Sequence, residues 1–410
     1  MNSSTTPAPA SRKDLPWLIL AGYFLAVPWE YRFDLLPVPP SQVFSALLGA
    51  VLGISVLLTR RLSLTTFHFL LVIWVAWCGA SLWNVYSDPS LREFLAFIKC
   101  LIIALAAWHI VHDVRAWLRL MQLYLASLLV ATLYALVDYL RLVGATENLW
   151  GEQQWRFTGT HYDPNVFSVT LAAALPLAGL AAAATASRAM RVACLALVPA
   201  GAYAIVLTAS RTGVVCLLVA GTLMLSTRFP GRRQIILFGG FLLAAAEFAG
   251  YLTIPGITTE RLTSTAEDIQ SGELSGRIAI WKAGLEVFAD NFMFGVGLGH
   301  YPDAMYRYLS RAFVAHNTLL SYAAETGVVG LALFVLTFGV LGFRSQRARG
   351  VVGPAPLISL ITLAVGSMTL TFSTEQPIWA LIILNAGLAF AAQMPAAEPT
   401  SAPVSPRLAA

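Results

Sequence analysis

The chain has 410 residues, of which 58% are hydrophobic and only 11% are charged, and its mean hydropathy is +0.71. This composition excludes a water-soluble globular protein, in which about a quarter of the residues are charged. The net charge of +5 is explained by the arginines that membrane proteins concentrate in their cytoplasmic loops. We therefore predict no nucleic-acid partner. The four cysteines all fall in apolar runs, so we expect free, buried thiols.

Apolar runs of about 20 residues, each long enough to cross a bilayer as a helix, recur along the sequence. These runs are continuous rather than alternating, which favours helices over a barrel. The sequence therefore predicts an all-α polytopic membrane protein, surrounded by membrane lipid, with about twelve transmembrane helices. We place these spans at 15–34, 41–59, 64–86, 91–111, 116–142, 166–186, 190–209, 213–227, 235–254, 317–342, 355–372 and 378–394.

The arginine and lysine residues predict the orientation of these spans. With the N-terminus inside, 15 of the 26 basic residues fall in short cytoplasmic segments, as the positive-inside rule requires. Residues 1–14 and 395–410 then form cytoplasmic tails, the second of them disordered. Residues 15–254 hold the first nine spans and 317–394 the last three. Residues 255–316 form a large periplasmic loop with amphipathic helices.

The periplasmic loop and one outer turn carry the candidate site. Arg211 lies in the tight turn between the seventh and eighth spans and opens the helix that follows. Arg277 opens an amphipathic helix with Ser275 as its N-cap and an apolar face of Ile278, Trp281, Leu285 and Phe288. We expect this face to rest at the membrane interface. His316 opens the tenth span. Two guanidinium groups and one imidazole thus stand at helix N-termini on the same side of the membrane.

This arrangement is typical of a site that binds a diphosphate. A helix N-terminus attracts anions, and arginine binds phosphate through two parallel hydrogen bonds. The same positive field would keep His316 neutral and able to accept a proton from a hydroxyl nucleophile. The alternatives are that each arginine is an interfacial anchor or ion-pair partner, and that His316 is a helix cap.

Further polar residues are weaker candidates. Lys99 lies on the same helical face as Arg92, and its depth in the membrane marks it as functional unless Asp138 or Glu247 pairs with it. For His300 a structural role is favoured. No His/Cys cluster supports a metal site, although Glu30 and Asp34 share the first outer loop. Gly295, Gly297 and Gly299 follow no β-strand, so they predict a close backbone turn rather than a nucleotide loop.

Several motifs between Arg156 and Gly330 resemble the O-antigen ligase and polymerase superfamily. They are Arg156-Phe-Thr-Gly159, Asp163-Pro-Asn165, Ser210-Arg211-Thr-Gly213, Arg277 with Trp281, Gly295-Val-Gly297, His316-Asn317 and Glu325-x-Gly327-x-x-Gly330. The resemblance implies a bacterial inner-membrane glycosyltransferase. Its donor would be a glycan on undecaprenyl diphosphate, and its acceptor a sugar hydroxyl of lipid A–core oligosaccharide.

The resemblance also implies residue roles. His316 would be the catalytic base, and Arg211 and Arg277 would hold the diphosphate. Transfer would invert the anomeric carbon without metal or cofactor. The accessory candidates are Arg156, Lys99, Arg92, His300 and Asn317. An O-antigen polymerase is the alternative, but its common Arg-to-Gly spacing of eleven is absent because Phe288 and Thr222 occupy those positions. The alternative from another class is a lipid-linked glycan transporter.

Overall fold

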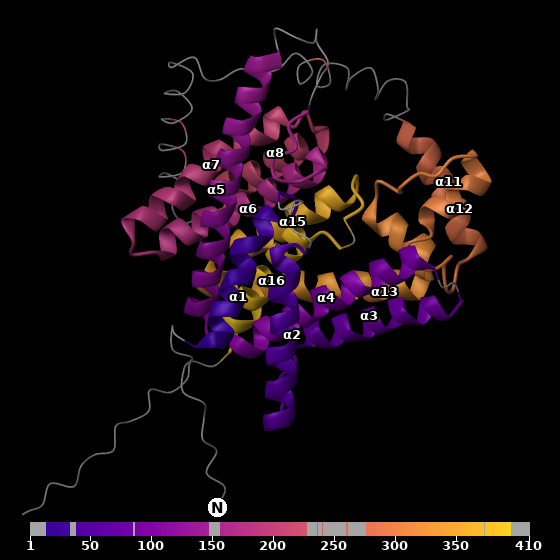
Figure 1. Ribbon diagram of the computed structural model, residues 1–410, viewed down its shortest axis with the longest axis horizontal. Helices are drawn as coiled ribbons and strands as arrows, with labels where there is room; N and C mark the ends of the chain where they lie inside the picture. Colours follow the sequence, from indigo (N-terminus) through magenta and orange to yellow (C-terminus); the bar gives the residue numbers. More distant parts are fainter. Residues whose placement is uncertain are drawn as a thin grey trace, which may run out of the picture.

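The computed structural model describes residues 14–32, 38–84, 87–146, 156–227, 276–372 and 374–394, together with residues 236, 240 and 260. Within these residues every regular element of secondary structure is a helix, as predicted (Figure 1). The elements are α1 (Leu15–Ala26), the 3-10 helix η1 (Val27–Trp29), α2 (Pro40–Thr59), α3 (Thr66–Asn84), α4 (Asp88–Ile110), α5 (Val114–Thr146), α6 (Pro164–Ala184), α7 (Arg188–Leu207), α8 (Arg211–Ser226), α11 (Arg277–Asp290), α12 (Tyr301–Leu309), α13 (Thr318–Arg347), α14 (Arg349–Val352), α15 (Ala355–Ser367) and α16 (Gln376–Ala391).

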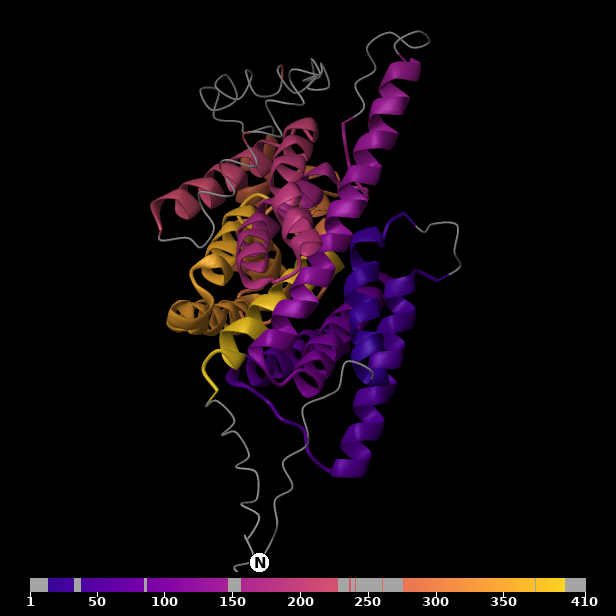
Figure 2. The same ribbon diagram turned by 90° about the vertical axis from the view of Figure 1, so that its left-hand side faces the viewer.

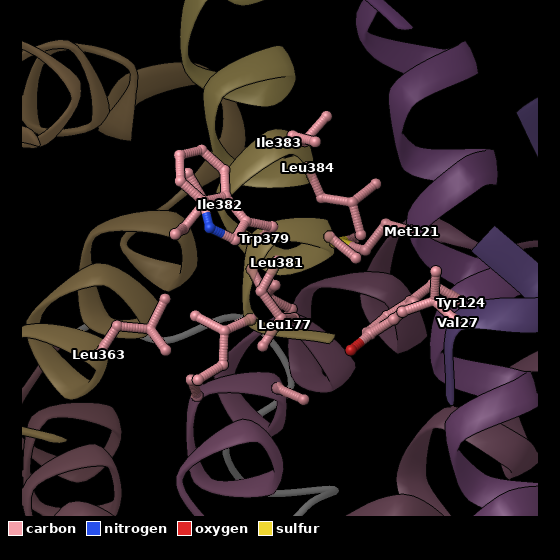
Figure 3. Close-up of a cluster of buried hydrophobic side chains, with 14 of the residues drawn as sticks. Val27, Met121, Tyr124, Leu177, Leu363, Trp379, Leu381, Ile382, Ile383 and Leu384 are labelled. Carbon is pink, nitrogen blue, oxygen red and sulfur yellow. The ribbon is translucent and has the colours of Figure 1, made fainter. Parts of the chain in front are cut away.

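Two helices form the centre of the bundle. Every residue of α16 is buried, and so is every residue of α6 from Val166 to Ala182. Both helices are apolar on all sides, which is the pattern of a helix surrounded by other helices. Figure 3 shows Leu177 of α6 near Leu381 of α16, with Leu363 of α15 on one side and Met121 of α5 on the other. The many alanines of α6 allow its neighbours to approach closely.

The structure contains six helices that are long and apolar enough to cross a membrane: Pro40–Thr59, Asp88–Ile110, Val114–Arg141, Pro164–Ala184, Arg188–Leu207 and Thr318–Arg347. Five shorter apolar helices cover Leu15–Trp29, Thr66–Leu82, Arg211–Ser226, Ala355–Ser367 and Gln376–Ala391. The remaining predicted span, 235–254, lies almost entirely outside the described residues. The prediction of a polytopic membrane protein is confirmed, and the count of twelve stays a prediction.

Helices α11 and α12 stand apart from the central bundle and contact it mainly through α13 (Figure 1). They enclose a small second core with the start of α13, formed by Ile280, Ala283, Val287, Tyr301, Met305, Ala315, Leu320 and Ala324. In Figure 2, α1 and α2 lie side by side along the edge of the molecule, with α5 next to α1. The predicted periplasmic loop is therefore a helical subdomain over the part that is described, 276–316.

Helix α13 is interrupted where it meets the turn that leads to α12. Gly327 has φ 68° and ψ −172°, outside the helical range. At this break Val296 N–H donates to Ala324 O at 2.8 Å, and Gly297 N–H donates to Glu325 O at 3.0 Å. A Cβ on Gly295 would lie 2.3 Å from the Glu325 carbonyl carbon. Gly295 thus permits a close backbone approach to another helix, as predicted.

Candidate functional site

Five helices begin in the same region of the molecule. The N-terminal segments of α6 and α8 are joined by side-chain hydrogen bonds, and those of α6 and α16 meet through His161 and Glu375. Thr212 of α8 and Thr318 of α13 both bond to the segment between α15 and α16. Helix α11 reaches the turn before α13 through a Trp281 hydrogen bond. The free N–H groups of these helix ends create a local positive field that favours anions.

Arg211 is held at the site by a bracket of hydrogen bonds around the turn before α8. Asn165 Oδ1 accepts from Arg156 Nη2 at 3.1 Å and from Ser210 Oγ at 2.8 Å. Arg156 Nε also donates to Thr208 O at 3.0 Å. Ser210 Oγ caps α8 by accepting from Gly213 N–H. Arg156 is therefore a positioning residue for the turn that presents Arg211.

Arg277 is the first residue of α11, as predicted, and its side chain is half-buried. The predicted cap Ser275 lies outside the described residues, and the residue before the helix is Gly276, which has φ 78° and makes no side-chain cap. Against its neighbours in the protein, α11 buries Ile280, Ala283, Gly284 and Val287, so the expected contact of its apolar face with the membrane interface stays a prediction. Leu285 is exposed, since burial follows the contact with α12 and α13 rather than the longest apolar stripe.

His316 stands two residues before α13 and has φ 45°. This left-handed conformation is uncommon for a residue with a side chain, and it turns the chain into the helix. Asn317 Oδ1 then caps α13 by accepting from Leu320 N–H at 3.0 Å, so Asn317 has a structural role. On the other side, Trp281 Nε1 donates to Ala315 O at 3.0 Å. His316 is thus fixed from both neighbours in the sequence.

The electrostatic surroundings keep His316 neutral. Burial lowers the pKa of the imidazole, the positive charge of Arg277 lowers it further, and the carboxylate of Asp163 acts in the opposite direction. The net pKa lies below the ordinary value. Two sequence-predicted site residues, Arg277 and His316, are therefore close enough to influence each other's charge. A neutral imidazole beside a guanidinium can accept a proton from a hydroxyl while an anion is bound next to it.

The sequence reasoning missed a cluster around Glu375, which precedes α16. Its carboxylate accepts from Tyr31 Oη at 2.6 Å, from His161 Nε2 at 3.0 Å and from Tyr162 Oη at 2.9 Å. Burial alone would raise the pKa of Glu375, but these hydrogen bonds outweigh it and the pKa is lowered. The polar residues 373–376, between the predicted spans 355–372 and 378–394, were the signal that could have indicated it.

The protonation of His161 follows from its contacts. Its Nδ1 accepts from Asp163 N–H at 2.9 Å, so Nε2 carries the proton and donates to Glu375. Asp163 in turn caps α6 by accepting from Asn165 N–H at 2.7 Å. The segment 161–165 therefore connects three parts of the site: the Glu375 cluster, the Arg211 bracket and the charge that acts on His316.

The remaining candidates have structural partners. Asp138, one of the two alternative partners considered for Lys99, is not its partner: Lys99 Nζ lies 3.8 Å from Glu30 Oε1, and Asp138 pairs with Arg32 at 2.8 Å. Those partners come from the chain around η1, whose approach to α4 and α5 no periodicity could reveal. Glu247 and Asp34 lie outside the described residues.

Two more candidates, Arg92 and His300, also have contacts of their own. Arg92 is exposed and bonds within its own helix, from Nε to Asp88 O at 3.4 Å. His300 Nδ1 lies 2.9 Å from Ser90 Oγ and joins the start of α12 to α4, in line with the structural role favoured for it.

Within the described residues, no group of three or more His, Cys, Asp and Glu side chains is arranged to hold a metal ion. The four cysteines are free and buried, as predicted. An open cavity of about 410 Å³ lies at the far end of α6, lined by Arg115, Leu118, Arg119, Gln122 and residues 184–186. It is about 30 Å from the start of α6 along the helix axis, so it plays no part in the site described above.

Comparison with known proteins gives one family match. Residues 195–335 match the family model described as O-antigen ligase, a range that includes Arg211, Arg277 and His316. No curated protein matches the chain. The match covers the signature motifs that meet at the break in α13, and it supports a membrane enzyme of the glycosyltransferase kind. The predicted resemblance is confirmed over residues 195–335, and this match supports a relationship to the superfamily of O-antigen ligases and polymerases.

Proposed function

We propose that this protein is an O-antigen ligase of the bacterial inner membrane, with its active site on the periplasmic side. It transfers a glycan from undecaprenyl diphosphate to a sugar hydroxyl of lipid A–core oligosaccharide. The observation that carries this proposal is the proximity of His316 and Arg277 at a point where several helix N-termini meet. That combination serves the two needs of the reaction, which are a base for the acceptor and positive charge for the leaving group.

The proposed step is a direct displacement. His316 takes the proton of the acceptor hydroxyl, and the oxygen forms a bond to the anomeric carbon of the donor sugar. The bond from that carbon to the diphosphate oxygen breaks, and its electron pair leaves with undecaprenyl diphosphate. Arg277 and Arg211 bind the diphosphate and stabilise its growing charge. Attack opposite the leaving group inverts the anomeric carbon.

The cationic groups already present make a metal ion unnecessary in this mechanism. A divalent cation at the same place would be repelled by the guanidinium groups, and this repulsion is strong in a partly dry site. We therefore propose that transfer persists in excess EDTA. Loss of transfer in EDTA, with recovery on adding Mg²⁺ or Mn²⁺, would contradict this mechanism.

The transporter alternative depended on unpaired charge inside the membrane. The Lys99 ammonium lies beside the Glu30 carboxylate, so this charge has a structural explanation. An assay in detergent separates the two classes directly, because transport needs two compartments and glycan transfer does not.

The test compares wild-type protein with His316→Ala in detergent, using undecaprenyl diphosphate-linked glycan and lipid A–core oligosaccharide. We expect the variant to bind the donor but to lose transfer by about 10²–10⁴-fold, the usual effect of removing a general base. Near-normal transfer at equal protein level would contradict the assignment. In cells that lack the gene, bare core with accumulated lipid-linked glycan indicates a ligase. Core that carries one repeat unit indicates a polymerase.

A further inference from the structure

A ring cluster lies next to the proposed base. Tyr31, His161 and Tyr162 surround the Glu375 carboxylate and also contact one another. The Tyr31 ring meets His161 edge-on with centroids 4.2 Å apart, and His161 stacks on Tyr162 at 4.5 Å and 29°. The cluster joins three separate parts of the chain: Tyr31 follows η1, His161 and Tyr162 precede α6, and Glu375 precedes α16. Neither the proposed base nor the proposed diphosphate contacts use these side chains.

The three rings are held rigidly. Glu375 accepts a hydrogen bond from each of them. A charged acceptor with three donors forms strong, directional bonds, so each ring has a fixed orientation. Thr160 Oγ1 also donates to Pro28 O at 2.7 Å, which fixes the segment 160–162 against the chain near η1. The cluster therefore forms a preorganised surface, which limits the entropy lost when a ligand is bound.

Tyr162 is oriented unlike a membrane anchor. An interfacial tyrosine keeps its ring in apolar surroundings and its hydroxyl toward water. Here the hydroxyl points inward to Glu375 while the residue is 65% exposed. One ring face stacks on His161, and the Tyr31 ring lies 4.9 Å away at 84°, so the exposed part includes the ring face opposite His161. An aromatic face with negative π density suits the C–H groups on the apolar side of a sugar ring.

The position of Tyr162 in the chain favours a substrate over a chance surface contact. The next residue, Asp163, lies close enough to His316 for its charge to act on the imidazole. Its carboxylate has acceptor capacity beyond the bond to Asn165 N–H, so it can bind sugar hydroxyls. Thr318, two residues after His316, also bonds to Leu370 O and Phe372 N in the segment that leads to Glu375. A sugar ring on Tyr162 would therefore lie on the same side of the site as the group that must deprotonate the acceptor.

We propose that Tyr162, fixed by Glu375 and His161, is a stacking platform for a sugar ring of a glycan substrate, adjacent to His316. This inference rests on the proposed function. The neighbouring base favours the acceptor glycan as the source of the ring, and a sugar of the lipid-linked donor has the same chemistry.

The experiment measures kcat and KM for each substrate separately, with undecaprenyl diphosphate-linked glycan and lipid A–core oligosaccharide as probes. Tyr162→Leu keeps apolar volume but removes the π-face, and Tyr162→Ala is the second variant. Tyr162→Phe keeps the ring. The matched control is Tyr306→Ala, which removes a tyrosine that is 64% exposed on α12. Because Tyr162 is mostly exposed, losing its ring removes little packing and the fold should persist.

We expect Tyr162→Leu and Tyr162→Ala to raise one KM by about five- to tenfold, as loss of an aromatic contact would, with kcat little changed. Tyr162→Phe should restore most of the affinity. A rise confined to lipid A–core assigns the platform to the acceptor, and a rise confined to the lipid-linked glycan assigns it to the donor. Unchanged KM values for both substrates would overturn the platform, and so would an equal effect of Tyr306→Ala.

The two proposals fail separately. If His316→Ala abolishes transfer while the Tyr162 variants leave both KM values unchanged, the platform is wrong and the proposed function stands. If His316→Ala transfers normally, the assignment of the base is wrong and the ligase activity stands; if the wild-type protein transfers no glycan, the proposed function is wrong whatever Tyr162 does.

Discussion

At the scale of single residues, the chemistry depends on how His316 is balanced between charges of opposite sign. Burial and Arg277 both favour the neutral imidazole, and Asp163 favours the protonated form. A general base with a very low pKa removes protons poorly, and one with a very high pKa is already protonated at the working pH. The positive φ of His316 adds a conformational cost of about 1–3 kcal/mol. That cost is consistent with a residue placed for function rather than for stability.

The influence of Asp163 can be measured through the pH dependence of transfer. Because Asp163 raises the pKa of His316, Asp163→Asn should lower that pKa. The neutral base then persists to lower pH, so the acid limb of kcat/KM should move toward lower pH. Asparagine is as good an N-cap as aspartate, so α6 should be preserved. Asp303→Asn on α12 is the control and should leave the limb in place; a shift toward higher pH in Asp163→Asn would contradict this arrangement.

Replacing Arg277 with lysine tests whether the guanidinium fork matters or only its charge. Lysine cannot form the two parallel bonds that arginine makes with phosphate. Loss of one charge-assisted hydrogen bond, worth about 1.5–3 kcal/mol, should reduce kcat/KM by roughly 10- to 150-fold. Arg307 is exposed on α12, and Arg307→Lys should be nearly neutral. Equal activity of Arg277→Lys and wild type would show that the residue contributes only charge or anchoring.

At the scale of elements, the break in α13 connects the site to the outer subdomain. Val328 N–H donates to Phe292 O at 2.8 Å, and Trp77 Nε1 donates to Thr326 O at 2.9 Å. The backbone groups released by the break are thus bonded to α3 and to the turn after α11. These contacts set where α11 stands relative to the start of α13, and therefore the distance between Arg277 and His316.

Gly327→Ala should disrupt this junction. The residue has φ 68°, and a Cβ would lie 2.2 Å from Met293 O, so the turn after α11 must move. We expect a loss of about 1–3 kcal/mol from backbone strain alone, seen as a lower apparent melting temperature of the detergent-purified protein. Gly342→Ala is the matched control in the same helix, because a Cβ there meets no atom within 4 Å and alanine favours helix. Equal melting temperatures of the two variants would contradict the role assigned to Gly327.

The elements also show what the sequence could predict. The apolar runs predicted where the spans lie. The polar residues at helix starts pointed to Arg211, Arg277 and His316 as candidate site residues. The bracket of Arg156, Asn165 and Ser210 and the cluster around Glu375 join positions from 9 to 344 residues apart. Periodicity reports only which face of a helix is apolar, so it could not reveal these pairings. For the same reason it did not show which side of α11 packs against α12 and α13.

At the scale of the whole molecule, the candidate site and the arginine-rich segments lie at opposite ends of the same helices. Helix α6 begins at the Asn165 bracket and ends just before Arg188, and α13 begins after His316 and ends at Arg347. The 21 residues of α6 span about 30 Å, the thickness of the bilayer core. The positive-inside rule then assigns the arginine-rich ends to the cytoplasm. On this basis we propose that the site faces the other side of the membrane.

This orientation predicts which introduced cysteines can be labelled from outside. The four native cysteines are buried, so the wild-type protein should react little with a membrane-impermeant maleimide and serves as the blank. Glu286 is exposed on α11 and Arg61 is exposed between α2 and α3. In intact spheroplasts we expect labelling of Glu286→Cys, because α11 belongs to the site end of the molecule. Arg61→Cys should react only after the membrane is permeabilised, because its neighbours belong to the arginine-rich end. The reverse pattern would place His316 in the cytoplasm and would exclude glycan transfer on the periplasmic side of the membrane.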